Sequence, residues 1–473
     1  MLKSLDIQTL QRAYETRQVT ALEVVRAVYA RIAASQRKGV WIQLVPETVS
    51  LELAKRLDSL LAGGSSRTLP LFGIPFAIKD NIDLQGLPTT AACPDFAYTP
   101  ERSATVVEKL IAAGAIPIGK TNLDQFATGL VGVRSPYGAC ENAFDARYIS
   151  GGSSSGSAVA VALGQVSFAL GTDTAGSGRV PAAFNNVIGL KPTKGLLSTR
   201  GVVPACRSLD CVSIFALTCG DTSRVFKIAR GFDTDALYSR VEADVPLPEN
   251  VPLKAFTFGV PQTAQLQTFE NADYATLFER ANARLVELGG KKVEIDFSPF
   301  REAAELLYSG PWVAERWVAL KDFLIAHPQS MFPVTKTIVS KGANFSAADA
   351  FEAQYTLEDC RRRALREWKK MNVLLTPTAS ALYTIEAVNA EPVALNSRLG
   401  YYTNYVNLLD CCALALPAGF DDSSLPFGVT LIAPAYKDGA LAELGARYHR
   451  IVGGHLGATS TPFSAMESEP QTT

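Results

Sequence analysis

Short apolar runs alternate with amphipathic segments along almost the whole of this 473-residue chain. Such alternation is typical of an α/β fold, because the apolar runs read as strands and the amphipathic segments as helices that cover them. Runs that are apolar throughout predict strands buried on both sides. The expected strands lie at 72–79, 115–121, 166–172, 187–191, 256–261, 291–297, 372–377 and 427–434. The expected helices lie at 22–35, 103–114, 222–232, 271–289, 348–371 and 438–454.

The sequence therefore predicts one large mixed sheet flanked by helices on both faces, in a single domain. Loops with Pro and Gly punctuate the chain throughout, and none of them reads as a linker between two domains. We expect the domain to span residues 1–456 and residues 457–473 to form a polar tail. The segment 231–253, rich in Asp, Glu and Pro, is expected to run over the surface.

Charge and cysteine content exclude several classes of protein. The net charge is −1, so a nucleic acid or an anionic membrane is not expected as a partner. The eight cysteines form no CxxC pair, and we therefore expect neither a zinc site nor a disulfide framework. Reduced cysteines and the lack of a signal-peptide pattern predict a cytoplasmic protein. The longest apolar stretch, 158–171, is too short and too interrupted to span a bilayer.

Residues 114–121, GAIPIGKT, match the pattern of a phosphate-binding loop, but the match is misleading. A phosphate loop follows a strand, opens a helix and offers backbone N–H groups from small residues. Here a helical pattern comes before the match, and Pro117 has no N–H to donate. The segment itself reads as a strand, and we do not expect nucleotide binding there.

Two clusters of Gly and Ser carry the strongest signal for chemistry. The first, SGGSSSGS at 150–157, reads as a flexible linker, a phosphate cradle, or a tight turn that brings hydroxyl and N–H groups into a buried site. Closely flanking apolar sequence argues against the linker, and the lack of a following lysine argues against the cradle. The chain has only three histidines and none lies in such a turn, so a Ser-His-Asp triad is poorly supported.

The second cluster, GTDTAGSG at 171–178, follows an expected strand directly. Its turn carries Ser177, and its backbone N–H groups could form the nest that an oxyanion needs. Asp173 and Arg179 lie close enough in sequence to brace the turn as an ion pair, which is a structural role.

A lysine near the end of an apolar run completes the set. Lys79 ends the expected strand 72–79, and the usual fate of such a side chain is to extend to the surface. The alternative is burial beside serines. A free lysine has a pKa of about 10.4, and desolvation can lower this value by roughly three units, which makes the amine a base near neutral pH.

Taken together, these residues resemble the amidase signature family. The resemblance rests on GIPFAIKDN around Lys79, GAIPIGKTNLDQFA at 114–127, GGSSSGSAVAVALG at 151–164 and GTDTAGSGRVPAAFNNVIGLKPTKG at 171–195. It implies the fold of that family, with Lys79 as the catalytic lysine, Ser153 as a bridging serine beside a cis peptide, and Ser177 as the nucleophile. It also implies an oxyanion hole formed by the N–H groups of Thr174, Ala175, Gly176 and Ser177, although many members of the family have glycine at the position of Ala175.

Within the family, the run from 171 to 216 and the segment LLYSGPWVAERW at 306–317 resemble the allophanate hydrolases. By that resemblance, Tyr308 and Arg316 hold the carboxylate of the substrate. Their spacing is about two helical turns, so both could point to one side of a single helix. The alternative is a surface salt bridge for Arg316 and a core position for Tyr308.

The resemblance implies hydrolysis of the terminal amide of allophanate through a Ser-Ser-Lys acyl-enzyme mechanism, with no cofactor and no metal. The alternatives are an amidase of the same family that acts on biuret-like, glutaminyl or aryl amides, and a scaffold of this fold without catalytic activity. Relatives of this kind are often homodimers, so a homodimer is expected. They commonly carry a second, C-terminal domain, which is expected to be absent from this chain.

Overall fold

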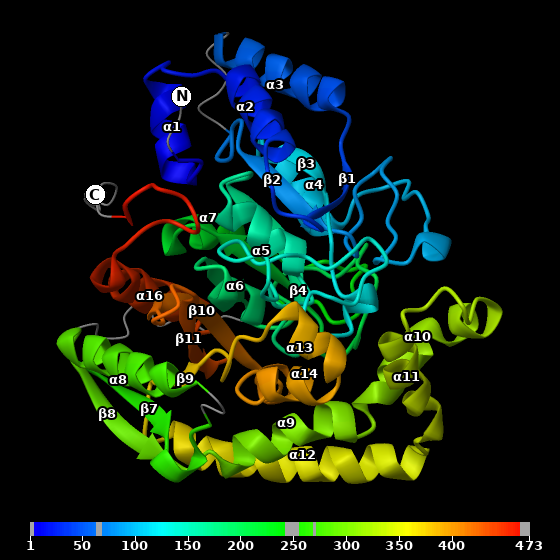
Figure 1. The fold of residues 1–473 in the computed structure, drawn as a ribbon, viewed down its shortest axis with the longest axis vertical. Helices are drawn as coiled ribbons and strands as arrows, with labels where there is room; N and C mark the ends of the chain where they lie inside the picture. Colours follow the sequence, from blue (N-terminus) through cyan, green and yellow to red (C-terminus); the bar gives the residue numbers. More distant parts are fainter. Residues whose placement is uncertain (1–3, 63–68, 242–254, 268–270, 464–473) are drawn as a thin grey trace.

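The structure is a computed structural model that describes residues 4–62, 69–241, 255–267 and 271–463. Within these residues, eleven strands form one sheet in the order β1-β3-β2-β4-β6-β5-β10-β11-β9-β7-β8 (Figure 1). Their bounds are β1 Trp41–Leu44, β2 Pro75–Lys79, β3 Ile116–Thr121, β4 Phe168–Asp173, β5 Ile188–Lys191, β6 Cys211–Ala216, β7 Phe256–Pro261, β8 Gly290–Ile295, β9 Val373–Pro377, β10 Cys411–Phe420 and β11 Pro426–Pro434.

Helices flank this sheet, as the alternating sequence pattern predicts (Figure 1). The first half of the chain forms α1 Ile7–Glu15, α2 Ala21–Ala33, α3 Glu47–Ala62, α4 Thr105–Ala112, α5 Ser155–Ala162, α6 Val180–Phe184 and α7 Cys219–Ala229. The second half forms α8 Ala272–Glu287, α9 Ser298–Ser309, α10 Trp312–Ala326, α11 Pro333–Ser340, α12 Ala347–Trp368, α13 Ile385–Ala390, α14 Ala394–Leu399, α15 Tyr405–Leu408 and α16 Asp438–Val452.

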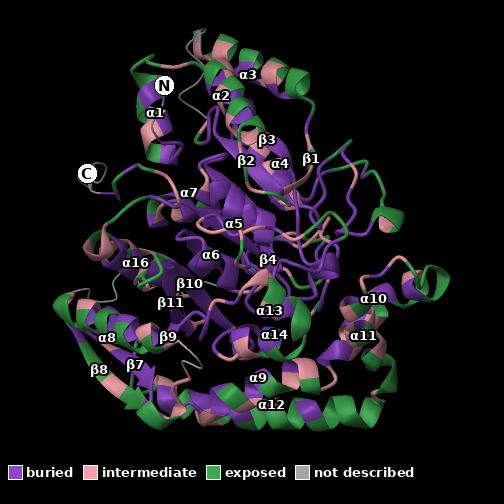
Figure 2. Ribbon diagram, in the orientation of Figure 1, coloured by how far each residue is buried: buried purple, intermediate pink, exposed green. Residues whose placement is uncertain are grey.

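The sheet is mixed, with parallel pairs toward its two sides and antiparallel pairs in the middle. Strand β2 pairs in parallel with β3 and β4, and β7 pairs in parallel with β8 and β9. The strands from β4 through β6, β5, β10 and β11 to β9 pair antiparallel, as does β1 with β3 at one edge. Every residue of β2, β3 and β4 is buried, which confirms the prediction that these apolar runs are covered on both sides (Figure 2).

All eight expected strands are present, and three more were not predicted. Strands β1, β6 and β10 have no counterpart among the expected runs. The false phosphate-loop match forms β3, as predicted, with Pro117 inside the strand. A capping box at Thr20 and Glu23 begins α2.

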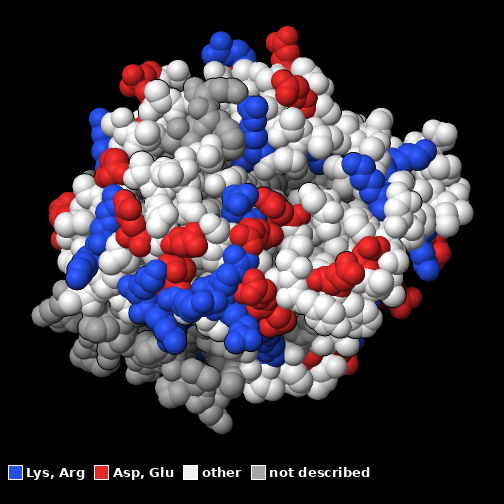
Figure 3. Space-filling view, turned by 90° about the horizontal axis from the view of Figure 1, so that it is seen from below, with Lys and Arg blue, Asp and Glu red and all other residues white. Residues whose placement is uncertain are grey.

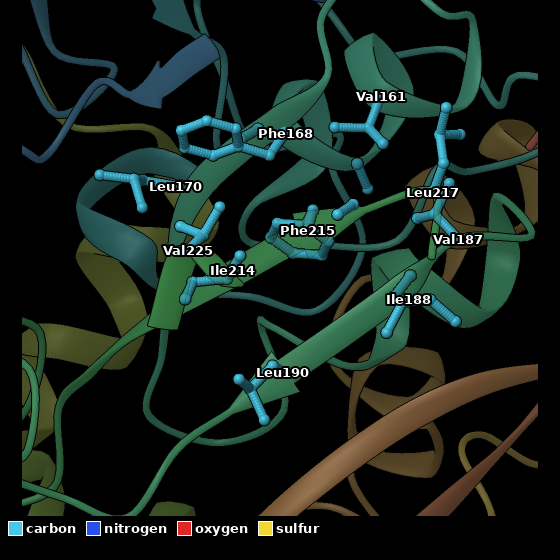
Figure 4. Packing of buried hydrophobic residues seen from close by; sticks show 14 of the residues in the cluster. Val161, Phe168, Leu170, Val187, Ile188, Leu190, Ile214, Phe215, Leu217 and Val225 are labelled. Atoms are coloured by element: carbon cyan, nitrogen blue, oxygen red, sulfur yellow. The ribbon is translucent and has the colours of Figure 1, made fainter. Parts of the chain in front are cut away.

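Close packing of apolar side chains joins the middle strands to the helices beside them. Phe215 of β6 lies among Val161 of α5, Phe168 of β4 and Ile188 of β5 (Figure 4). Phe215 is fully buried, and a Cβ atom added at Gly171 would lie only 2.7 Å from its ring. Strand β4, which leads into the second Gly/Ser turn, is therefore held by packing as well as by its hydrogen bonds.

Residues 457–463, the first part of the predicted polar tail, belong to the described fold. Phe463 is buried, and its ring stacks on His449 of α16 with the ring centroids 4.2 Å apart. Residues 464–473 lie outside the described residues. The same holds for residues 242–253 of the expected surface excursion, whereas 231–241 are described.

Candidate active site

Lys79 is the last residue of β2 and is fully buried. Its Nζ lies 2.8 Å from Ser153 Oγ and 2.7 Å from Thr172 Oγ1. Asn81 Nδ2 reaches the same threonine oxygen at 3.3 Å. The side chain is therefore buried beside a serine and does not extend to the surface, and every residue of β2, which lies between β3 and β4, is buried.

Burial lowers the pKa of Lys79 from 10.5 to about 7. The carboxylates of Asp124, Asp210 and Asp173 act against this shift, and the positive charge of Arg316 adds to it. Desolvation is the largest cause, because a charged ammonium loses its hydration in a dry site. The amine can therefore be neutral near pH 7 and accept a proton.

Ser153 lies in a buried turn that leads into α5, which agrees with the third interpretation of the SGGSSSGS cluster. The peptide bond between Gly152 and Ser153 is cis, as the resemblance implies. No side chain fits at Gly152, because a Cβ atom there would lie 2.2 Å from Asp124 Oδ2. The backbone N–H of Asp124 donates to the carbonyl oxygen of Ser153 at 3.2 Å.

Asp124 braces the loop that lies beside Ser153. Its side chain is fully buried, and three backbone N–H groups donate to it at distances from 3.0 to 3.1 Å. These groups belong to Val131, Gly132 and Arg134. A carboxylate that accepts several N–H bonds fixes the backbone around it, so these bonds hold the loop 131–134 against Asp124, whose own N–H donates to Ser153.

Ser177 lies between β4 and the short helix α6, and it is buried. The predicted ion pair is confirmed, since Arg179 Nε lies 2.8 Å from Asp173 Oδ2 and both side chains are fully buried. The N–H of Gly178 also donates to Asp173, at 3.0 Å. Asn407 of α15 completes the brace, because its Nδ2 donates to the carbonyl oxygens of Asp173 and Leu209 at 2.8 and 2.9 Å.

The N–H groups of residues 174–177 have a different environment from their neighbours. Within the described part of the chain, none of them donates a hydrogen bond to another residue, whereas the N–H groups of Gly178 and Arg179 both do. Gly176 has a φ of 143°, and a Cβ there would lie 2.4 Å from Thr403 Oγ1, so only glycine fits. Unpaired N–H groups in a fixed turn can stabilise a developing negative charge.

Thr174 ties this turn to the next loop. Its hydroxyl donates to Asp210, whose carboxylate also accepts from the N–H groups of Ala205 and Cys206. Asp210 is buried, and this burial raises its pKa. The loop 205–210 is therefore fixed against the residues that follow β4.

Tyr308 and Arg316 lie together, but they do not share one helix as expected. Helix α9 ends at Ser309, and Gly310 and Pro311 separate it from α10, which carries Arg316. Arg316 Nη2 nevertheless lies 3.3 Å from the Tyr308 hydroxyl, and its guanidinium carbon lies 5.4 Å from the centre of the tyrosine ring.

Arg316 is buried, which excludes the alternative of a surface salt bridge. Its Nη1 donates to Thr128 Oγ1 at 3.0 Å, and its Nε has no hydrogen-bond partner among the described residues. Its hydrogen bonds within the described chain thus go to uncharged oxygens, and a buried arginine without a bonded carboxylate can receive one from a ligand.

Sequence reasoning missed the residues that hold this arrangement. Three of these residues contact predicted site residues directly, and a fourth bonds to the backbone of Asp173, yet none was singled out. They are Thr172, Asp124 and Asp210, and Asn407. Thr172 and Asp124 lie within the motifs GTDTAGSG and GKTNLDQFA, so their place in these motifs is a signal that could have found them.

The described residues contain no cluster of His, Cys, Asp and Glu that could hold a metal ion. Within the same residues, no helix is both long and apolar enough to cross a membrane. All eight cysteines are buried.

Comparison with known proteins identifies the family. The model of the Amidase family matches residues 23–442. The chain belongs to the amidase family. A glutamyl-tRNA(Gln) amidotransferase component from Picosynechococcus sp. is 32% identical to it, over 95% of this chain and 98% of that relative. A urea amidolyase from Saccharomyces cerevisiae is 47% identical over 91% of this chain, but only 23% of the amidolyase is covered.

The fold of this amidase-family chain is also found in solved structures. Allophanate hydrolase from Kluyveromyces lactis matches it with a TM-score of 0.91 and 42% identity, over 98% of this chain and 76% of that one. The predicted family and the predicted mixed sheet with flanking helices are therefore confirmed. The chain spans less than a quarter of the length of the urea amidolyase that it matches.

Proposed function

We propose that this chain hydrolyses the terminal amide of allophanate and releases ammonia. The observation that carries the proposal is the buried Lys79 amine, which lies 2.8 Å from Ser153 Oγ at the end of β2. The likeness to an allophanate hydrolase over 98% of the chain supports the choice of substrate. Amide hydrolysis is the chemistry of the family.

In the proposed mechanism, neutral Lys79 accepts a proton from Ser153, and Ser153 accepts the proton of Ser177. The oxygen of Ser177 attacks the amide carbonyl carbon and forms a tetrahedral intermediate. The N–H groups of residues 174–177 stabilise its oxyanion. The proton returns through Ser153 to the nitrogen, the C–N bond breaks, and ammonia leaves.

A water molecule then attacks the acyl-enzyme and gives up its proton along the same path. The ester bond to Ser177 breaks, the serine recovers its proton, and a dicarboxylated amine is released. Tyr308 and Arg316 hold the carboxylate that allophanate carries at its other end. The low polarity around Lys79 favours the first step, because it keeps the amine uncharged.

Replacement of the nucleophile tests the mechanism. Ser177→Ala is expected to lower kcat for ammonia release from allophanate by at least about 10³-fold, as loss of a nucleophile does in other hydrolases. Ser59→Ala is the matched control, since Ser59 is exposed on α3 and its hydroxyl donates to the carbonyl oxygen of Lys55 within the same helix. Wild-type turnover by Ser177→Ala would show that another group is the nucleophile.

The substrate is tested separately at Arg316. Arg316→Gln is expected to reduce kcat/KM for allophanate by about 10²-fold or more and to change kcat/KM for a neutral amide far less, because only allophanate has a carboxylate to pair. Arg301→Gln, on the exposed face of α9, is the control. Equal losses for both substrates would show that Arg316 is structural. A higher kcat/KM of the wild type for a neutral amide than for allophanate would favour a biuret-like, glutaminyl or aryl amide as substrate.

A scaffold without activity is the remaining alternative, and a serine-directed fluorophosphonate distinguishes it. An active enzyme is labelled at Ser177, whereas an inactive scaffold is not.

A homodimer and a cytoplasmic location remain predictions from the sequence, and sedimentation velocity tests the first of them.

A further inference from the structure

A cavity whose lining includes none of the candidate active-site residues lies where β10 begins and β11 ends. Its volume is about 420 Å³. Three positively charged side chains and one carboxylate line it, together with apolar groups. The charged residues are Lys194, Arg240, Arg361 and Asp410, and the apolar residues include Leu365, Trp368 and Leu409.

The charges of this cavity do not balance. Arg240 pairs with Asp410 through both terminal nitrogens, each at 2.9 Å, which neutralises the one carboxylate that the described residues contribute to the lining. Arg361 pairs with Glu358, a largely exposed residue outside the lining, and donates to the carbonyl oxygen of Leu408 at 2.9 Å.

Lys194 has no bonded carboxylate among the described residues, because Asp410, the negative charge that attracts it, is already paired with Arg240. It is half-buried, and its Nζ reaches only the carbonyl oxygen of Ser208, at 3.4 Å, among the contacts within the described residues. Burial lowers the pKa of this lysine. A cation in such a place is destabilised unless an anion pairs with it.

The surroundings are rich in positive charge as well. The run RRRALREWKK at 361–370 lies at the C-terminal end of α12, the lowest element in Figure 1, and extends two residues beyond it. Three of its six cations pair with carboxylates, and the remaining ones are Arg362, Arg366 and Lys369. The face seen from below has Lys and Arg side chains gathered in one area, with Asp and Glu side chains at its border (Figure 3). An approaching anion is attracted by such a surface.

We propose that this cavity binds a small organic anion. Its carboxylate or phosphate group contacts Lys194 and Arg361, and its apolar or planar part packs on Trp368 and Leu365. An arginine and a lysine together suit such a group, because the guanidinium donates in a fixed fork and the ammonium adds a compact charge. The proposal is independent of the substrate of the candidate active site.

Isothermal titration with phenyl phosphate, benzoate and neutral benzyl alcohol tests it. The titrations use the full chain with Arg316→Gln, so that anion binding in the candidate active site does not contribute. We expect one saturable site for at least one of the two anions and none for benzyl alcohol. Binding of one anion alone identifies the preferred charged group and supports the proposal.

Variants locate the site. Lys194→Gln is expected to weaken anion binding by more than about 10-fold, the loss typical of one charged contact, whereas Lys369→Gln, an exposed residue at the end of α12 and outside the lining, is expected to leave it nearly unchanged. Trp368→Leu should weaken the binding of phenyl phosphate more than the binding of inorganic phosphate. If Lys194→Gln does not fold, Arg361→Gln serves instead, because its side chain is 36% exposed.

Two results would overturn the proposal. One is the absence of saturable binding for both anions. The other is unchanged affinity in Lys194→Gln and Arg361→Gln, which would place the anion elsewhere. Neither result depends on whether the chain hydrolyses allophanate, because turnover is not the readout.

Discussion

A buried lysine can act as a base only after it has lost its proton. Because the pKa of Lys79 is lowered to about 7, we expect kcat/KM to rise about tenfold per pH unit below pH 7 and to level off above it. Ammonia release measured between about pH 5 and 9 checks this. Lys79→Met should abolish the activity, and Lys227→Met on α7 is a matched control. A flat profile over this range would mean that Lys79 is not the base.

The same pKa has a consequence for stability, whose sign follows from proton binding. Between about pH 7 and 10.5 the unfolded chain holds a proton on Lys79 that the folded chain has released, so folding becomes more favourable as the pH rises. Lys79→Met removes this contribution.

We therefore expect the free energy of unfolding of the wild type, relative to that of Lys79→Met, to increase by up to ~1.4 kcal/mol for each pH unit in this window. Urea unfolding of both proteins at about pH 7.5, 8.5 and 9.5 measures the difference. A difference that does not change with pH would show that the native amine keeps its proton.

At the scale of single residues, the sequence predicts the residues proposed to carry the reaction better than it predicts the residues that hold them in place. Lys79, Ser153 and Ser177 belong to short motifs, and each is buried as the proposed role requires. Asn407 could not be predicted, since it contacts a carbonyl oxygen 234 positions away and the sequence around it carries no motif. Such contacts depend on the tertiary fold, which local patterns do not contain.

At the scale of elements, the short helix α15 links two parts of the molecule. Asn407 holds the backbone at the end of β4, and α15 also packs on α9, the helix of Tyr308. The candidate nucleophile and the candidate carboxylate site are thus positioned through one four-residue helix.

Asn407→Ala is therefore expected to lower kcat by about 10- to 100-fold, because it frees the carbonyl oxygens of Asp173 and Leu209 and loosens the turn. Its effect on KM should be small, since Asn407 is not among the proposed substrate contacts. Steady-state kinetics and the rate of fluorophosphonate labelling measure this. Asn372→Ala, at the exposed start of β9, is the control. Unchanged labelling would assign Asn407 to stability alone.

The break between α9 and α10 was not predicted from the sequence. The spacing of Tyr308 and Arg316 suggested one continuous helix, but Gly310 and Pro311 end α9 and start α10. This pair is itself a stop signal in sequence. The two side chains meet nevertheless, with Arg316 Nη2 3.3 Å from the Tyr308 hydroxyl.

At the scale of the whole molecule, three strands were not predicted, and one of them, β6, is an apolar run that is buried throughout. Strand β1 has only four residues, none of them fully buried, and β10 contains Pro417 and Gly419, which local rules place outside central strands. The structure accommodates both residues because the register with β11 shifts between them. The order of the strands in the sheet could not be predicted, since it depends on contacts between distant segments.

One continuous sheet implies that the chain unfolds as a unit, which tests the single domain that the sequence predicts. Phe215 lies on β6 in the middle of the sheet and faces Ala169 of β4 and Gly189 of β5. Phe215→Ala is expected to cost about 3–5 kcal/mol, because it removes a buried ring from a closely packed core. Calorimetry should show one transition in both proteins, shifted to lower temperature in the variant. Val318→Ala, an exposed change on α10, should leave the transition in place. Two separate transitions, of which only one moves in Phe215→Ala, would contradict a single cooperative domain.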